Sequence, residues 1–170
     1  NRADHCFAPL ITQNARLLVL GSYPGKSSLE KQEYYAHPRN VFWRIMSEII
    51  GFDRSSGYQK RTGALINAGV ALWDVVYSCK RVGSLDSKIE SHSIYVNDFK
   101  TLLRSTSGLR AIIFNGAKAE QEFRNRVAPS VAELTESMEL VRLPSTSPAL
   151  AALSFAEKLK RWRVIETYLR

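Results

Sequence analysis

Four short segments of the chain are almost continuously apolar, and each is followed by turn-forming or polar residues. They cover residues 16–21, 69–74, 109–114 and 139–143. Uninterrupted apolarity, rather than alternation of apolar and polar positions, is typical of strands buried on both faces of a sheet. The pattern therefore predicts four buried strands.

Helical patterns separate these segments. An apolar helical face runs through residues 41–50 and stops at Gly51, and shorter patterns cover residues 99–108 and 117–127. Near the end, Ser154 and Glu157 have the spacing of a capping box at the start of a final helix over residues 153–170. Strands alternating with helices predict a single-domain α/β fold over residues 1–170: a doubly wound, four-stranded parallel sheet with helices on both faces. Residues 1–15 form a lead-in to it.

Composition narrows the class of protein. The 24 Lys and Arg against 16 Asp and Glu give a net charge of +8, which fits either an anionic partner or a solvated basic face. No apolar run is long enough to span a membrane, and the N-terminus has no signal-peptide pattern. Cys6, Cys79 and three scattered histidines show no metal-ligand spacing. We expect no metal and no cofactor, and a reducing cytoplasm is the simplest location.

Parallel α/β sheets bind ligands beyond the carboxyl ends of their strands, so the residues after each strand are the candidates. The first strand is followed by Gly-Ser-Tyr-Pro-Gly at 21–25 and by a polar, aromatic stretch at 34–43. The second strand ends at Asp74, and the third is followed by Asn115. The fourth is followed by a Pro-Ser-Thr-Ser-Pro loop at 144–148. Each has a plain structural alternative. Asn40 could serve purely as a helix cap, and Asp74 could pair with an arginine. Both loops could simply be rigid turns.

In this order, the segments resemble the uracil-DNA glycosylase superfamily. Residues 21–25, the Tyr-Ala-His-Pro-Arg-Asn-Val-Phe-Trp-Arg run at 35–44 and the Pro-Ser-Thr-Ser-Pro loop look like its signature motifs. The chain departs from the pattern at Tyr23, where members usually carry a catalytic Asn or Asp. A phenol is a poor activator of water at neutral pH. This version of the motifs looks most like the hypoxanthine-DNA (deoxyinosine) glycosylase branch.

The resemblance implies that a deaminated base is flipped out of DNA and removed by water, without strand cleavage. It makes Asn40 the catalytic residue. The residues expected around the base are Ser22, Tyr23, Tyr35, His37, Asp74 and Asn115. The residues expected to contact DNA are Lys26, Arg39, Ser145, Thr146, Ser147 and Leu150. We further infer that an ionised Asp74 accepts a hydrogen bond from N1–H of hypoxanthine. Leu150 is the best candidate wedge for the vacated stack, unless it belongs to the core of the last helix.

Three other functions stay open at this stage. The first is a superfamily enzyme that prefers uracil, or uracil in mismatches. The second is a binding module for damaged DNA without catalysis, which the loss of the usual residue at Tyr23 suggests. The third is a small-molecule hydrolase that uses Ser22 or Ser145, although no nucleophile elbow is present. Because Lys26 lies close to the expected site in sequence, strand cleavage by a lyase reaction is a further, minor alternative. We expect a monomer.

Overall fold

A central parallel sheet carries the fold, as predicted. The computed structural model describes residues 4–170, so residues 1–3 of the expected lead-in lie outside the described residues. Its strands are β1 (Leu17–Gly21), β2 (Val70–Asp74), β5 (Ala111–Asn115) and β6 (Glu139–Leu143), in the spatial order β2-β1-β5-β6. All three strand pairings are parallel. The strands β1, β2 and β5 are fully buried, whereas the edge strand β6 is partly exposed.

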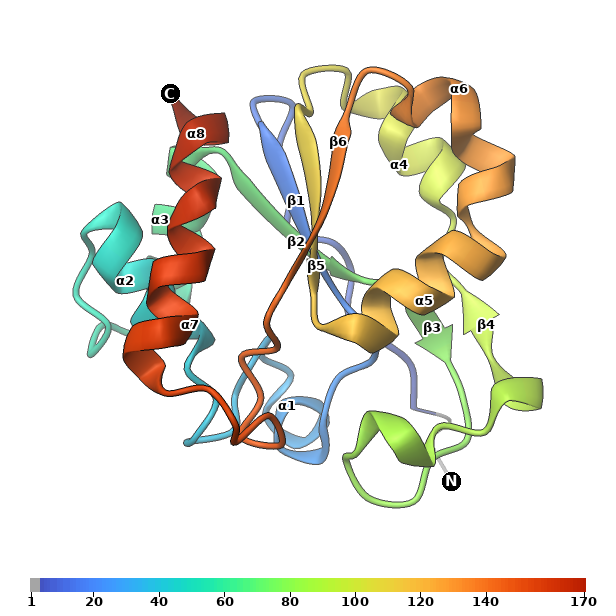
Figure 1. Ribbon diagram of the computed structural model, residues 1–170, viewed down its shortest axis with the longest axis horizontal. Helices are drawn as coiled ribbons and strands as arrows, with labels where there is room; N and C mark the ends of the chain where they lie inside the picture. The colour runs from blue at the N-terminus through green and yellow to red at the C-terminus, as the bar shows by residue number, and fades with distance from the viewer. Residues whose placement is uncertain (1–3) are drawn as a thin grey trace.

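Helices cover both faces of this sheet (Figure 1). One face carries α2 (Phe42–Ile50), α3 (Tyr58–Ala68), α7 (Phe155–Trp162) and α8 (Glu166–Leu169), and the other carries α4 (Phe99–Ser105), α5 (Ala117–Arg126) and α6 (Ala132–Thr135). The short helix α1 (Lys26–Lys31) lies beyond the carboxyl ends of the strands. A small antiparallel pair, β3 (Val76–Ser78) and β4 (Tyr95–Val96), follows β2.

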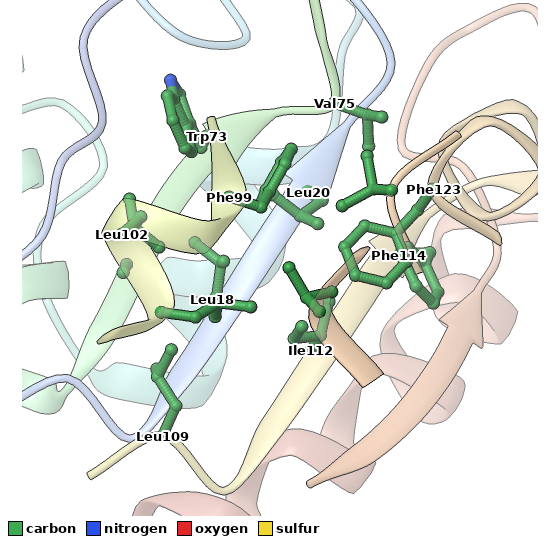
Figure 2. Close-up of a cluster of buried hydrophobic side chains, with 14 of the residues drawn as sticks. Leu18, Leu20, Trp73, Val75, Phe99, Leu102, Leu109, Ile112, Phe114 and Phe123 are labelled. Carbon is green, nitrogen blue, oxygen red and sulfur yellow. The ribbon is translucent and has the colours of Figure 1, made fainter. Parts of the chain in front are cut away.

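Alternate side chains of the same strands build two cores. On β1, Leu18 and Leu20 face α4 and α5 and pack with Phe99, Phe114 and Phe123 (Figure 2). The intervening side chains, Leu17 and Val19, join the opposite core with the apolar faces of α2 and α7. Full burial of such a side chain stabilises the fold by roughly 1.5–3 kcal/mol. The two cores fix the sheet between the helical layers and thereby fix the loops at its ends.

Two of the predicted helix ends are observed, whereas the helix expected over residues 99–108 ends at Ser105. Gly51 ends α2 in the left-handed region, with φ of 93°, which glycine adopts without strain. Ser154 and Glu157 form both hydrogen bonds of the capping box at the start of α7. The final helical region differs from the prediction, because a 3₁₀ turn at Arg163–Ile165 separates α7 from α8. Within residues 4–170, no helix combines the length and apolarity needed to cross a membrane.

Candidate active site

The turns that leave the four strands enclose a cleft of about 1190 Å³. Figure 1 shows α1 and the loop that follows β6 at this same end of the sheet. Every residue that the sequence nominated for the site lines this cleft, although the segments that supply them are far apart in sequence. Over the part of the chain that the structure describes, no group of three or more potential metal ligands occurs.

The floor of the cleft holds two buried polar groups above Gly21. Neither Oδ2 of Asp74 nor the hydroxyl of Tyr35 has a hydrogen-bond partner. A Cβ atom at position 21 would lie 2.5 Å from Asp74 Oδ1 and 3.2 Å from the Tyr35 hydroxyl. Glycine is therefore needed here, because any side chain would displace these groups. The two orphaned atoms, brought together at a cleft, mark a place where a polar ligand can bind.

Asp74 sits at the end of β2 with 4% of its surface exposed. No ion pair to it is found among residues 4–170, so the pairing with arginine considered above is not observed. Burial, together with the nearby charge of Asp86, raises the pKa of the Asp74 carboxyl to about 7, while Arg81 opposes this rise. Asp74 can therefore exchange its proton near neutral pH.

Tyr35 forms a wall of the cleft. Its ring is half-buried and packs on Phe42, with centroids 4.1 Å apart and planes tilted by 32°. Its φ of 55° lies in the left-handed region, which is unusual for an aromatic residue. Strained backbone of this kind persists where surrounding contacts hold it, often at functional sites. Tyr35 thus combines a contact with Phe42 and a place in the lining of the cleft.

Asn115 and Thr146 join the end of β5 to the loop after β6. The Asn115 amide accepts from the Thr146 backbone N–H at 2.9 Å and donates to the Thr146 hydroxyl at 3.0 Å. The Thr146 carbonyl in turn accepts from the N–H of Val41 at 3.1 Å. Thr146 is only 1% exposed, and its expected contact with DNA stays a prediction. Its hydroxyl is enclosed, and its interactions hold the loop in place.

Asn40 lies where this loop meets α2. Its side-chain oxygen accepts from the N–H of Phe42 at 2.9 Å. The formal N-cap of α2 is Val41, one residue later than the sequence suggested. The capping bond engages only the oxygen of the amide. The half-buried Asn40 therefore supports the helix and still has its NH₂ group to donate into the cleft.

The turn after β1 presents backbone rather than the Tyr23 side chain. That side chain packs with Cys6, Val76 and Ile89, and its hydroxyl is buried without a partner. The phenol therefore points into this cluster, and the expected contact of Tyr23 with the base stays a prediction that its backbone can meet. Burial raises the pKa of Tyr23 to about 12, which excludes it as a base at neutral pH. Beside it, the Ser22 hydroxyl donates to Asp86 at 2.5 Å.

Sequence reasoning missed part of the site. Asp86 reaches the cleft from a loop twelve positions after β2, where no strand-end signal points to it. Three missed cations lie on the rim with the predicted Lys26 and Arg39: Lys118, Arg142 and Arg161. Their spacing in sequence gives no sign of proximity.

Leu150 also lines the cleft, half-buried, on a turn in which its N–H donates to the Ser147 carbonyl at 3.1 Å. Since α7 begins only at Phe155, the alternative that Leu150 starts the core of the last helix is wrong. Leu150 therefore stands at the mouth of the cleft on the loop after β6.

Comparison with known proteins now identifies the family. Residues 8–166 match the model of the uracil DNA glycosylase superfamily. The chain belongs to this superfamily. Membership confirms the resemblance carried by the motifs and agrees with the observed sheet. The roles of single residues in a superfamily reaction remain predictions.

Two similar proteins come from species of Methanosarcina. The chain is 43% identical over 114 residues to a hypoxanthine DNA glycosylase of Methanosarcina barkeri, and 40% identical over 114 residues to one of Methanosarcina acetivorans. Each match covers 66% of this chain and 71% of the relative. A solution NMR structure of a candidate uracil DNA glycosylase from Methanosarcina acetivorans superposes with a TM-score of 0.79 at 33% identity, covering 96% of both chains.

Proposed function

We propose that this protein is a DNA glycosylase that removes hypoxanthine, the deaminated form of adenine, from DNA. Superfamily membership supports the reaction class, and the two relatives named as hypoxanthine DNA glycosylases support the substrate. The observation on which the substrate assignment rests most heavily is the buried Asp74 carboxyl, with an unpartnered oxygen at the floor of the cleft.

Recognition begins with extrusion of the nucleotide from the duplex, which costs a few kcal/mol and is cheapest at a mispair. The base then stacks on the ring of Tyr35, a contact worth about 1–3 kcal/mol. In its ionised form, Asp74 accepts from N1–H of hypoxanthine. Adenine has no hydrogen on N1 and would leave this buried carboxylate unpaired, so the same geometry rejects the normal base.

Hydrolysis breaks the bond between C1′ and N9 and forms a new bond from C1′ to a water oxygen. The Asn40 NH₂ group donates to that water and holds it against C1′, while its oxygen keeps α2 in place. The purine leaves with the bonding electrons. Backbone donors at Ser22 and Tyr23 and the Asn115 amide stabilise the departing negative charge, and the proton released by water neutralises it. Catalysis of this kind is positional and electrostatic, so it needs no strong base.

The DNA backbone is held at the mouth of the cleft. Ser145 and Ser147 lie on the loop that Thr146 anchors, where their hydroxyls can donate to phosphate. His37, Arg39 and Lys26 are exposed and also line the cleft. Leu150 would occupy the space that the extruded nucleotide leaves. No lysine nucleophile takes part, so the product is an intact strand with an abasic site.

The test is an excision assay on duplexes that differ only in one base: hypoxanthine, uracil or xanthine. The proposal predicts that hypoxanthine is released fastest and that strand breaks appear only after alkali treatment. Release of uracil without hypoxanthine would reject the substrate assignment in favour of uracil. Uracil is included because the similar solved structure is of a candidate uracil DNA glycosylase. Specific binding without release of any base would instead favour a damage-binding module.

A further inference from the structure

The loop between β3 and β4 is fixed firmly on the first turn of the site. The Arg81 guanidinium donates to the carbonyls of Gly83 at 2.9 Å and of Pro24 at 2.6 Å. The Ser84 hydroxyl accepts from the N–H of Lys26 at 2.8 Å. A β-bridge between Arg81 and Ile89 closes the base of the loop. These contacts join residues 81–89 to the turn after β1, so the loop has a defined position beside the cleft.

This anchored loop nevertheless exposes two aliphatic side chains. Val82 is 87% exposed and Leu85 is 50% exposed, and Val82 is the most exposed of the large apolar residues among residues 4–170. Single exposed apolar residues are ordinary on protein surfaces. The pair on this anchored loop differs, because Leu85 also lines the cleft and Val82 lies three positions before it on the same loop. The loop therefore places one exposed aliphatic side chain in the cleft lining and a second close to it in sequence.

The charges of the loop favour an anionic partner. Lys80 and Lys88 flank the two aliphatic residues and are exposed. The loop has two carboxylates: Asp86 accepts from the Ser22 hydroxyl inside the cleft, and Glu90 is exposed. The loop thus combines exposed aliphatic groups with three cations, Lys80, Arg81 and Lys88, against two carboxylates. That combination suits the stacked bases and phosphates of DNA.

We propose that Val82 and Leu85 form a second apolar contact with duplex DNA, against the base pairs beside the extruded nucleotide. The inference rests on the proposed function. In Figure 1 the loop that bears these residues and the loop after β6 lie on either side of α1 at the end of the sheet. Leu150 and the Val82–Leu85 pair would therefore support the distorted duplex from two sides. Such support holds a kinked duplex open but gives little to a single strand, which has no stack to separate.

The test measures dissociation constants at fixed salt for a duplex with a central abasic-site analogue and for the same strand alone. The Val82→Ser/Leu85→Ser double variant is compared with the wild type and with Val164→Ser. Val164 is also aliphatic and 40% exposed, but it lies in the turn before α8 and does not line the cleft. We expect the double variant to bind the duplex about tenfold more weakly and the single strand as the wild type does. Val164→Ser should change neither.

Equal duplex binding by the double variant and the wild type would overturn the inference, as would equal losses on duplex and single strand. Thermal unfolding checks that the exposed substitutions leave the fold intact, and Val82→Ser alone serves if Leu85→Ser alters it. The binding assay needs no excision. Failure of the wild type to release hypoxanthine would therefore reject the proposed function separately, without deciding the role of this loop.

Discussion

Replacing Asp74 by Asn tests the floor of the cleft through both stability and activity. In the folded protein the Asp74 carboxyl has a pKa of about 7, against an ordinary value of 3.8, because it is buried and faces the charge of Asp86. Below pH 4 both folded and unfolded chains hold this proton. Between pH 4 and 7 the unfolded chain releases it while the folded chain keeps it, so folding becomes progressively less favourable as pH rises.

The magnitude follows from the two pKa values. A change from 3.8 to about 7 corresponds to on the order of 4 kcal/mol of folding free energy lost by pH 8. The Asp74→Asn variant cannot titrate at this position. Its stability relative to the wild type should therefore increase by up to that amount between pH 4 and pH 8. Any pH-independent cost of the new amide cancels from this difference.

Activity should respond in the opposite sense. If the ionised carboxylate accepts from N1–H, kcat/KM of the wild type for hypoxanthine rises with pH through about 7 and then levels. Asp74→Asn should be slower, and its profile should lose this rise. Asp86→Asn is the matched control. It removes a neighbouring charge that raises the Asp74 pKa, so the rise should move to lower pH.

Urea unfolding at several pH values and steady-state excision kinetics provide both measurements. A stability difference between Asp74→Asn and the wild type that does not vary with pH would refute the claim that burial raises the pKa of Asp74. A wild-type kcat/KM that falls as pH rises through 7 would show that the protonated acid is the active form. Asp74 would then be a donor, and the proposed discrimination against adenine would fail.

Two further substitutions test the walls of the site. Thr146→Val removes the hydroxyl that accepts from Asn115 and leaves a buried N–H donor unpaired. It should therefore lower the free energy of unfolding in urea by about 1–3 kcal/mol and slow excision as the loop loosens. Unchanged stability and rate would contradict the role given to this pair. Tyr35→Phe should preserve stacking, whereas Tyr35→Leu should weaken binding of an extruded base by roughly 1–3 kcal/mol, and equal excision kinetics for the two variants would exclude stacking on this ring.

The sheet could be predicted from the sequence because its strands are buried on both faces. Leu17 and Val19 enter one core and Leu18 and Leu20 the other, so nearly every position is apolar. The helix α3 was missed because it has few buried apolar positions. It is largely polar, buries only Leu65 fully and contains Gly63, so it has no strong apolar face. The short α1 and the pair β3 and β4 have too few residues to produce a periodic signal.

The site was predictable only to the level of strand ends. Topology brings the ends of parallel strands together, which is why Tyr35, Asp74 and Asn115 could be grouped. Side-chain direction is set by local packing, and the sequence does not reveal it. Tyr23 therefore turned out to point into an apolar cluster, and Thr146 proved to be enclosed. Asp86 enters through a long loop whose path depends on contacts formed only in the folded protein.

The most direct test of the whole account is single-turnover release of hypoxanthine by Asn40→Ser, measured beside its affinity for the same duplex. Serine retains a hydroxyl that can accept from the N–H of Phe42 and so support α2, but it lacks the NH₂ group assigned to the water. The account predicts hypoxanthine release by the wild type, and a rate at least about 100-fold lower in Asn40→Ser with little change in affinity. Release by Asn40→Ser at the wild-type rate would contradict it, and so would a wild type that binds the duplex and releases nothing.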